Sequence, residues 1–119
     1  MKKKDINKLP TKARSQYKML QVMLAQQKIQ RKAKNDFMSF TKAVWPEFIE
    51  GAHHRIIAKK FNDLAEKKIN RLIINMPPRH TKSEFASYLL PAWMVGKNPK
   101  LKIIQATHTG ELAVRFGRK

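Results

Sequence analysis

The sequence predicts an α/β fold in which a parallel sheet follows a basic helical arm. Two observations predict the sheet: from Leu72 onward, short β-branched apolar runs alternate with segments of helical periodicity, and this order is that of a βαβ unit. A third observation predicts the arm, because residues 1–35 are rich in Lys and Arg and contain no Gly. We expect the arm to occupy residues 1–44 and an incomplete α/β domain, with only two strands, to occupy residues 45–119.

Composition narrows the class of protein. The 119 residues are 42% hydrophobic, which suffices for the core of one small domain. With 26 Lys and Arg against 8 Asp and Glu, the net charge of +18 favours a polyanionic partner, and nucleic acid first among these. The absence of Cys excludes disulfides and Cys-based zinc or thiol chemistry. Because no apolar stretch approaches membrane-spanning length, we expect a soluble intracellular protein with no membrane partner.

The first two helices are predicted from spacing and capping. Apolar residues recur at helical intervals in the arm, but their stripe is narrow and rotates around the helix. This favours a solvated helix docked along one edge, with a DNA-binding helix as the alternative. Asp36 is a candidate N-cap for a short helix from Phe37 to Trp45, which Pro46 interrupts.

A second amphipathic helix is expected after Gly51 and should end near Asn70. One face of it carries His54, Ile57, Phe61 and Leu64. The run Leu72–Ile74 then predicts a short strand that is buried on both faces of a parallel sheet.

The last part of the chain is expected to complete the βαβ unit. A helix from Lys82 to Met94 should bend near Pro91, which lacks a backbone donor. A second strand is expected from Leu101 to Ala106, followed by a helix that begins around Gly110. One side of the first of these helices should carry Phe85, Leu89, Ala92 and Trp93, and we expect Trp93 and Phe116 to be core residues.

The stretch "RLIINMPPRHTKSE", residues 71–84, has the frame of a phosphate-binding loop: an apolar run before it and a helix after it. Lys82 supplies a charge for phosphate, and Ser83 supplies a hydroxyl for a metal ion. In the pattern G-x-x-x-x-G-K-[ST], however, the two glycine positions fall on Met76 and Thr81. Because a β-branched Thr81 disfavours a left-handed conformation, the loop must differ in its details. The alternative is a basic loop whose Thr81 or Ser83 merely caps the helix.

Several motifs in order carry a family resemblance. "PPRHTKS" at residues 77–83 is followed by "PAW" at 91–93, by "GKNP" at 96–99, and by "LA" and "FGR" at 112–113 and 116–118. From Trp45 to Lys119 the chain resembles the start of the ATPase domain in the large terminase subunit of tailed bacteriophages, the motor that packages DNA into procapsids. The departure from the family is Thr81, where the family usually has Gly.

The resemblance implies a P-loop NTPase-type sheet, with ATP and Mg²⁺ as cofactors. Lys82 would contact the β- and γ-phosphates, Ser83 would ligate Mg²⁺, and the loop from Arg79 through His80 and Thr81 would line the phosphate site. His54 and Arg55 lie where related motors place adenine contacts; for His54 the alternative is a histidine packed on a helix face. Arg115 and Arg118 would face DNA or a neighbouring subunit.

The resemblance also implies partners and a location. These are double-stranded DNA, the portal protein, the small terminase subunit and further copies in a ring, in the cytoplasm of an infected bacterium and not in the virion. No apolar run ending in Asp-Glu follows Lys82, and the acidic residues are scattered. We therefore expect this chain alone neither to hydrolyse ATP nor to cut DNA. Two alternatives stay open: a helicase-like nucleic-acid-dependent ATPase, and a basic DNA-binding remnant without catalysis.

Overall fold

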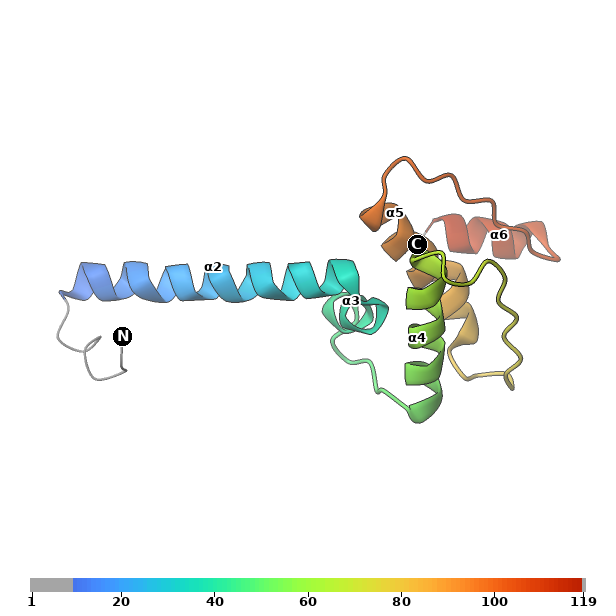
Figure 1. Ribbon diagram of the computed structural model, residues 1–119, viewed down its shortest axis with the longest axis horizontal. Coiled ribbons are helices and arrows are strands. Elements are labelled where there is room, and N and C mark those ends of the chain that lie inside the picture. Colours follow the sequence, from blue (N-terminus) through green and yellow to red (C-terminus); the bar gives the residue numbers. More distant parts are fainter. Residues whose placement is uncertain (1–9, 119) are drawn as a thin grey trace.

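The computed structural model of the chain describes residues 10–118, and this part is helical without any strand. Its elements are α2 (Thr11–Asn35), α3 (Phe37–Val44), α4 (Ala52–Ala65), the π-helix η1 (Glu84–Leu89), α5 (Leu90–Lys97) and α6 (Gly110–Gly117). The molecule measures 63 × 28 × 28 Å because α2 projects from a body formed by the later elements (Figure 1). No helix among the described residues has the length and apolar character needed to cross a membrane.

An aromatic cluster forms the core of the body. Phe37 of α3 is fully buried, and its ring meets those of Phe61, Phe85 and Trp93 edge to face, with centroids 4.9, 5.3 and 5.5 Å away. Edge-to-face pairs contribute about 0.5–1.5 kcal/mol each beyond the burial of their area. One phenylalanine therefore joins α3 to α4, η1 and α5.

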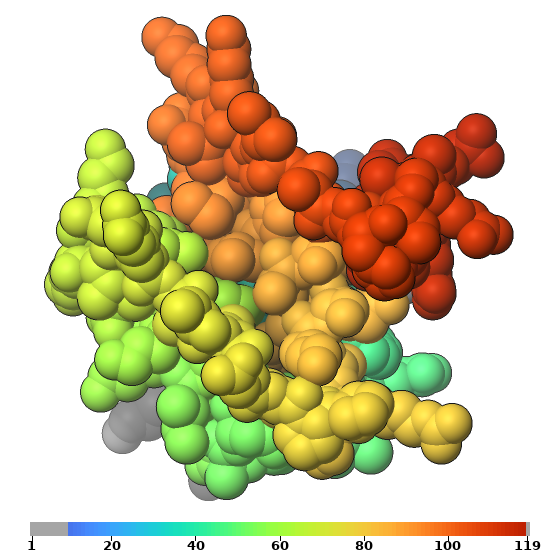
Figure 2. Space-filling view, turned by 90° about the vertical axis from the view of Figure 1, so that its right-hand side faces the viewer, coloured from blue at the N-terminus to red at the C-terminus, as the bar shows by residue number. Residues whose placement is uncertain are grey.

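The expected α/β fold, with its P-loop NTPase-type parallel sheet, is wrong for the described residues. Segments 72–76 and 101–106 are extended, but neither forms a strand. In Figure 2 the yellow and orange segments lie apart on this face, with atoms of the helical stretch that follows residue 82 between them. A strand needs a backbone partner, and the two segments are not neighbours.

Burial also departs from the expectation of strands covered on both faces. Leu72, Ile74 and Met76 pack against the core, but Ile73 between them is 85% exposed, and Ile104 in the other segment is 96% exposed. The β-branched residues thus favour an extended backbone, but no other element of the described part of the chain covers the outer side of Ile73 or Ile104. The β-branched apolar runs predict two strands, and neither run has the backbone partner that a strand needs.

The predicted start of α3 is confirmed. The Asp36 carboxylate accepts hydrogen bonds from the Ser39 backbone N–H at 2.8 Å and the Ser39 hydroxyl at 2.6 Å. α4 also starts as expected, with His54, Ile57 and Phe61 buried, but it ends at Ala65 and not near Asn70. It ends early because Lys67 takes a left-handed conformation, φ 59°, in the turn that follows.

The helix expected from Lys82 forms and runs without a break to Lys97, and its hydrogen-bonding pattern changes just before Pro91, where a bend was expected. The stretch before Pro91 is the π-helix η1, and α5 continues to Lys97. Pro91 has no N–H for the carbonyl of Ser87 four residues earlier, and that carbonyl instead accepts a hydrogen bond from Gln105 Nε2 at 2.8 Å. Leu89 and Trp93 are buried as expected, whereas Ala92 is exposed.

α6 begins at Gly110 as expected, and the Thr109 hydroxyl caps it by accepting from the Leu112 N–H at 3.3 Å. The prediction that Phe116 is a core residue is wrong. Phe116 is only half-buried, and α6 contributes no fully buried residue.

α2 is attached to the body at its C-terminal end. Ala33 is the buried residue of this helix, and its carbonyl accepts a hydrogen bond from Trp93 Nε1 at 2.9 Å. At 1.5 Å per residue its 25 residues span about 37 Å, more than half of the long axis of the molecule. Its middle section exposes several large apolar side chains, namely Met19, Leu20, Val22, Met23, Leu24 and Ile29. The helix is therefore solvated along most of its length rather than docked along an edge.

Candidate functional site

The residues predicted to hold phosphate lie together in one loop, residues 77–83, which we call the basic loop. It connects the extended segment 72–76 to the helical stretch that begins at Lys82. A surface hollow of about 350 Å³ is lined by Pro78, Arg79, His80, Thr81, Lys82, Ser83 and Glu84. All five predicted phosphate-site residues, Arg79 to Ser83, thus border the same hollow.

Two residues of the basic loop have backbone conformations that side chains rarely adopt. The φ angles of Arg79 and Thr81 are 64° and 61°, both in the left-handed region. Such a conformation at a residue other than glycine costs on the order of 1–3 kcal/mol and is most unusual for a β-branched residue. Thr81 therefore adopts the left-handed conformation that the sequence argument considered unfavourable for it. The loop has the backbone shape of a glycine-containing turn without containing glycine.

Polar contacts hold the basic loop in this shape. The Lys82 ammonium donates to the Met76 carbonyl at 2.8 Å, which closes the loop across its base. His80 Nδ1 donates to the Pro78 carbonyl at 2.9 Å. The Thr81 hydroxyl lies 3.1 Å from His54 Nε2 of α4. The loop is therefore tied both to its own start and to a neighbouring helix.

His54 is the sequence-predicted residue outside the loop that reaches it. This residue is 6% exposed, and its ring packs against the rings of Phe48 and Phe85, with centroids 4.8 and 5.0 Å away. Burial lowers the pKa of His54 below its usual 6.5, the neighbouring His53 and the more distant His80 lower it further, and Glu50 opposes them. A buried imidazole in these surroundings favours its neutral form.

The other predicted contact residues are not brought to the hollow. Arg55 Nε lies 3.3 Å from the Glu50 carboxylate, which also pairs with Lys42. Arg115 lies in the last turn of α6 and Arg118 just after it, and neither lines the hollow. The structure thus separates His54, which touches the loop, from the three arginines, which do not line it.

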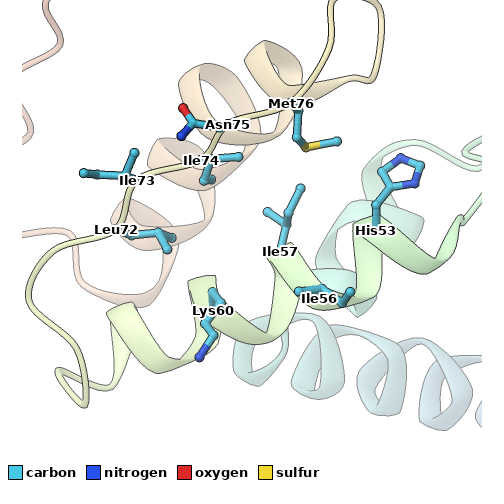
Figure 3. A pocket seen from close by; sticks show the side chains of 9 residues that line it. All are labelled: His53, Ile56, Ile57, Lys60, Leu72, Ile73, Ile74, Asn75 and Met76. Carbon is cyan, nitrogen blue, oxygen red and sulfur yellow. The ribbon is translucent and has the colours of Figure 1, made fainter.

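A second, apolar hollow lies between α4 and segment 72–76 (Figure 3). It has a volume of about 270 Å³. Ile57 points from α4 toward the extended segment, whose Ile74 and Met76 face it, and His53 stands at the end of the hollow. Because Met76 also supplies the carbonyl that holds Lys82, this hollow and the basic loop share a wall.

The residues present fit a nucleotide phosphate with Mg²⁺ in their chemistry. Arg79, His80 and Lys82 bring positive charge or N–H donors to the hollow, and the Ser83 hydroxyl is a metal ligand of the type that P-loops use. Among the described residues, no three His, Asp or Glu side chains are grouped to hold a metal ion. Mg²⁺ at a phosphate site does not require such a group, because phosphate oxygens and water supply most of its ligands.

Comparison of the chain with family models, with curated proteins and with solved structures finds no match. The geometry of the basic loop and the order of the sequence motifs are therefore what bears on function. The link from His54 to Thr81 was missed by the sequence argument. Its signal in the sequence is weak, because the two residues are 27 positions apart and the link depends on how α4 packs.

Proposed function

We propose that this chain is part of a phage terminase large subunit, and that its basic loop binds the phosphates of ATP together with Mg²⁺. The observation that carries the proposal is the hollow bordered by all five residues from Arg79 to Ser83 on a backbone with two left-handed residues. Left-handed residues turn successive N–H groups toward one side of a loop, which is how phosphate loops cradle anions. The ordered motifs from residue 77 to residue 118 support the same proposal.

Each residue of the loop has a role in this proposal. Without nucleotide, the Lys82 ammonium donates to the Met76 carbonyl at 2.8 Å. When ATP binds, it donates to the phosphate oxygens instead. Ser83 supplies a hydroxyl to Mg²⁺, which would neutralise phosphate charge when bound. The N–H groups of the loop and of the first helical turn face a negative ligand, and the helix dipole favours it there.

The proposed macromolecular partner is double-stranded DNA. α2 carries seven basic residues and no acidic one; they are Lys12, Arg14, Lys18, Lys28, Arg31, Lys32 and Lys34. This helix is about 37 Å long and carries its basic residues towards its two ends, and such positive charge attracts phosphate backbones without reading their sequence (Figure 1). Portal protein, the small terminase subunit and ring formation belong to the same proposal and follow from the family resemblance.

A second candidate function is DNA binding without any nucleotide. The charge of α2 favours it, because that helix lies outside the basic loop and needs no ATP to attract DNA. The two candidates differ in whether ATP and Mg²⁺ bind at residues 79–83. Both predict that affinity for DNA falls steeply as salt rises.

The test is calorimetric titration of the full chain with ATP in the presence of Mg²⁺. Lys82→Ala should weaken binding at least about tenfold, the loss expected for a charge-assisted contact worth 1.5–3 kcal/mol. Lys100→Ala, which removes the same charge from an exposed turn, is the matched control and should bind as the wild type does. Equal affinities for the two variants, or binding of DNA with none of ATP, would favour the second candidate.

A further inference from the structure

A chain of polar contacts connects the start of α4 to the basic loop. The Gly51 backbone N–H donates to His54 Nδ1 at 3.0 Å. On the other side of the same ring, His54 Nε2 lies 3.0 Å from His53 Nε2 and 3.1 Å from the Thr81 hydroxyl. His53 comes from the first turn of α4 and extends toward segment 72–76 (Figure 3). One buried imidazole therefore touches the helix cap and the loop at once.

The backbone contact fixes the protonation state of this imidazole. A backbone N–H can only donate, so His54 Nδ1 must accept and carry no proton. A neutral ring then has its single proton on Nε2, and this one N–H faces both the Thr81 hydroxyl and His53 Nε2. A protonated ring would put a second N–H against that of Gly51, and the two donors would repel. The observed arrangement requires neutral His54.

The contact with Thr81 falls on a residue that needs support. Thr81 is β-branched and has a φ of 61°, so its own conformational preference opposes the shape of the loop. Its hydroxyl is the group that His54 holds, and His54 is in turn fixed by Phe48, Phe85 and the cap of α4. Strained residues persist where the surroundings hold them in place.

We propose that His54 is the positioning residue of the basic loop: its neutral imidazole holds Thr81 in the left-handed conformation that phosphate binding uses, and its protonation at Nδ1 breaks the Gly51 contact that fixes the ring and so loosens the loop. The proposal rests on the proposed function for the identity of the ligand, while the coupling of His54 to the loop stands on geometry alone. Where a phosphate loop has glycine, this chain has a Thr and a histidine that supports it. Phosphate binding thereby becomes dependent on pH.

The charged groups around His54 favour its neutral form. The charges of His53 on α4 and His80 on the basic loop lower the pKa of His54, whereas Glu50, in the segment before α4, raises it and is already paired with Lys42 and Arg55. Phe48 and Phe85 supply no charge. Protonation of His54 is thus opposed on the sides of α4 and the loop, and the contact of Nδ1 with the Gly51 N–H breaks at a pH below the usual 6.5.

The first test needs no nucleotide. In a ¹⁵N-labelled chain, the ring nitrogens of His54 should show the neutral form with the proton on Nε2, and the amide signals of Thr81 and Lys82 should move with the His54 midpoint as pH falls below 6.5. His54→Gln keeps a polar group and does not titrate, so it should remove that pH response, whereas His108→Gln on an exposed turn should retain it. Loop signals that ignore pH, or that respond equally in His54→Gln, would overturn the proposal.

The second test uses ATP with Mg²⁺ as the probe. His54→Ala should weaken binding about 3- to 10-fold, the effect of losing one hydrogen bond. Adding Thr81→Gly to that variant should restore the affinity, because glycine adopts a positive φ without support. Weak binding that Thr81→Gly leaves unchanged would overturn the positioning role. If the wild type binds no ATP while the nuclear magnetic resonance result holds, the coupling stands and the proposed function fails.

Discussion

Replacing Asp36 by Ala should test how the helices are joined. The carboxylate of Asp36 caps α3 through Ser39 and accepts a hydrogen bond from Asn62 Nδ2 of α4 at 2.9 Å. The Asn62 side-chain oxygen in turn accepts from the Phe37 N–H at 2.9 Å, so this pair of residues connects α3 to α4 next to the core. Asp36→Ala removes the cap and leaves Asn62 without its acceptor.

The magnitude follows from these contacts. Loss of an N-cap costs about 0.5–2 kcal/mol, and loss of a hydrogen bond to a charged group costs about 1.5–3 kcal/mol. Because Asp36 is partly exposed, we take the lower part of the combined range and expect a loss of about 2–3 kcal/mol. For a domain of this size that lowers the melting temperature by about 10–20 °C. Asp36→Asn keeps the cap and one acceptor, so it should lose about 1 kcal/mol.

The assay is urea unfolding followed by circular dichroism, with Glu47→Gln on the exposed surface as the control. Burial raises the pKa of Asp36, but hydrogen bonds from Ser39 and Asn62 and the charge of Lys32 lower it more, so the net pKa lies below its usual 3.8. The stability that the Asp36 carboxylate contributes is present above pH 3.8 and is lost as pH falls through the lower folded-state pKa. The Asp36→Asn variant should not show this loss. A midpoint for Asp36→Ala equal to that of Glu47→Gln would refute the reasoning.

Three further outcomes are expected. Lys67→Gly should stabilise the chain by about 0.5–1 kcal/mol, because the residue at this left-handed helix end has a φ of 59°; a lower melting temperature would argue against that account. Trp93→Phe should cost about 2 kcal/mol and speed amide exchange in the last turn of α2, since the Ala33 carbonyl loses its donor; unchanged exchange would contradict the link. The folded-state pKa of His54 is lowered, so the contribution of His54 to the free energy of unfolding should be complete above about pH 6.5 and should decrease as pH falls toward that lower pKa. If the urea midpoint of His54→Gln falls equally with pH, His54 is not the cause.

Local signals in the sequence predicted the helices well. Asp36 identified the start of α3, Gly51 stands directly before α4, and Pro91 lies in the first turn of α5, where the π-helical pattern of η1 ends. Each of these signals acts within one turn of the chain, where capping and the loss of a donor decide the backbone. Helical spacing predicts the shared face of α4 that carries Phe61, and Trp93 is expected in the core; both side chains are buried.

Non-local features were beyond the same reasoning. The runs around Ile73 and Ile104 have strand-like residues, but a sheet depends on which segment lies alongside, and here the helical stretch after residue 82 lies between them. Phe116 was assigned to the core from its type alone, although α6 contributes no fully buried residue. The contact of His54 with Thr81 depends on the packing of α4 against the loop.

The measurement that tests the central claim most directly is hydrogen–deuterium exchange of the full chain with and without ATP and Mg²⁺. If the basic loop binds the phosphates, exchange should slow at the amides of residues 79–85, and Lys82→Ala should abolish the change while Lys100→Ala keeps it. Exchange that slows elsewhere in the described residues but not in the basic loop, or that does not respond to ATP and Mg²⁺ at all, would contradict the account.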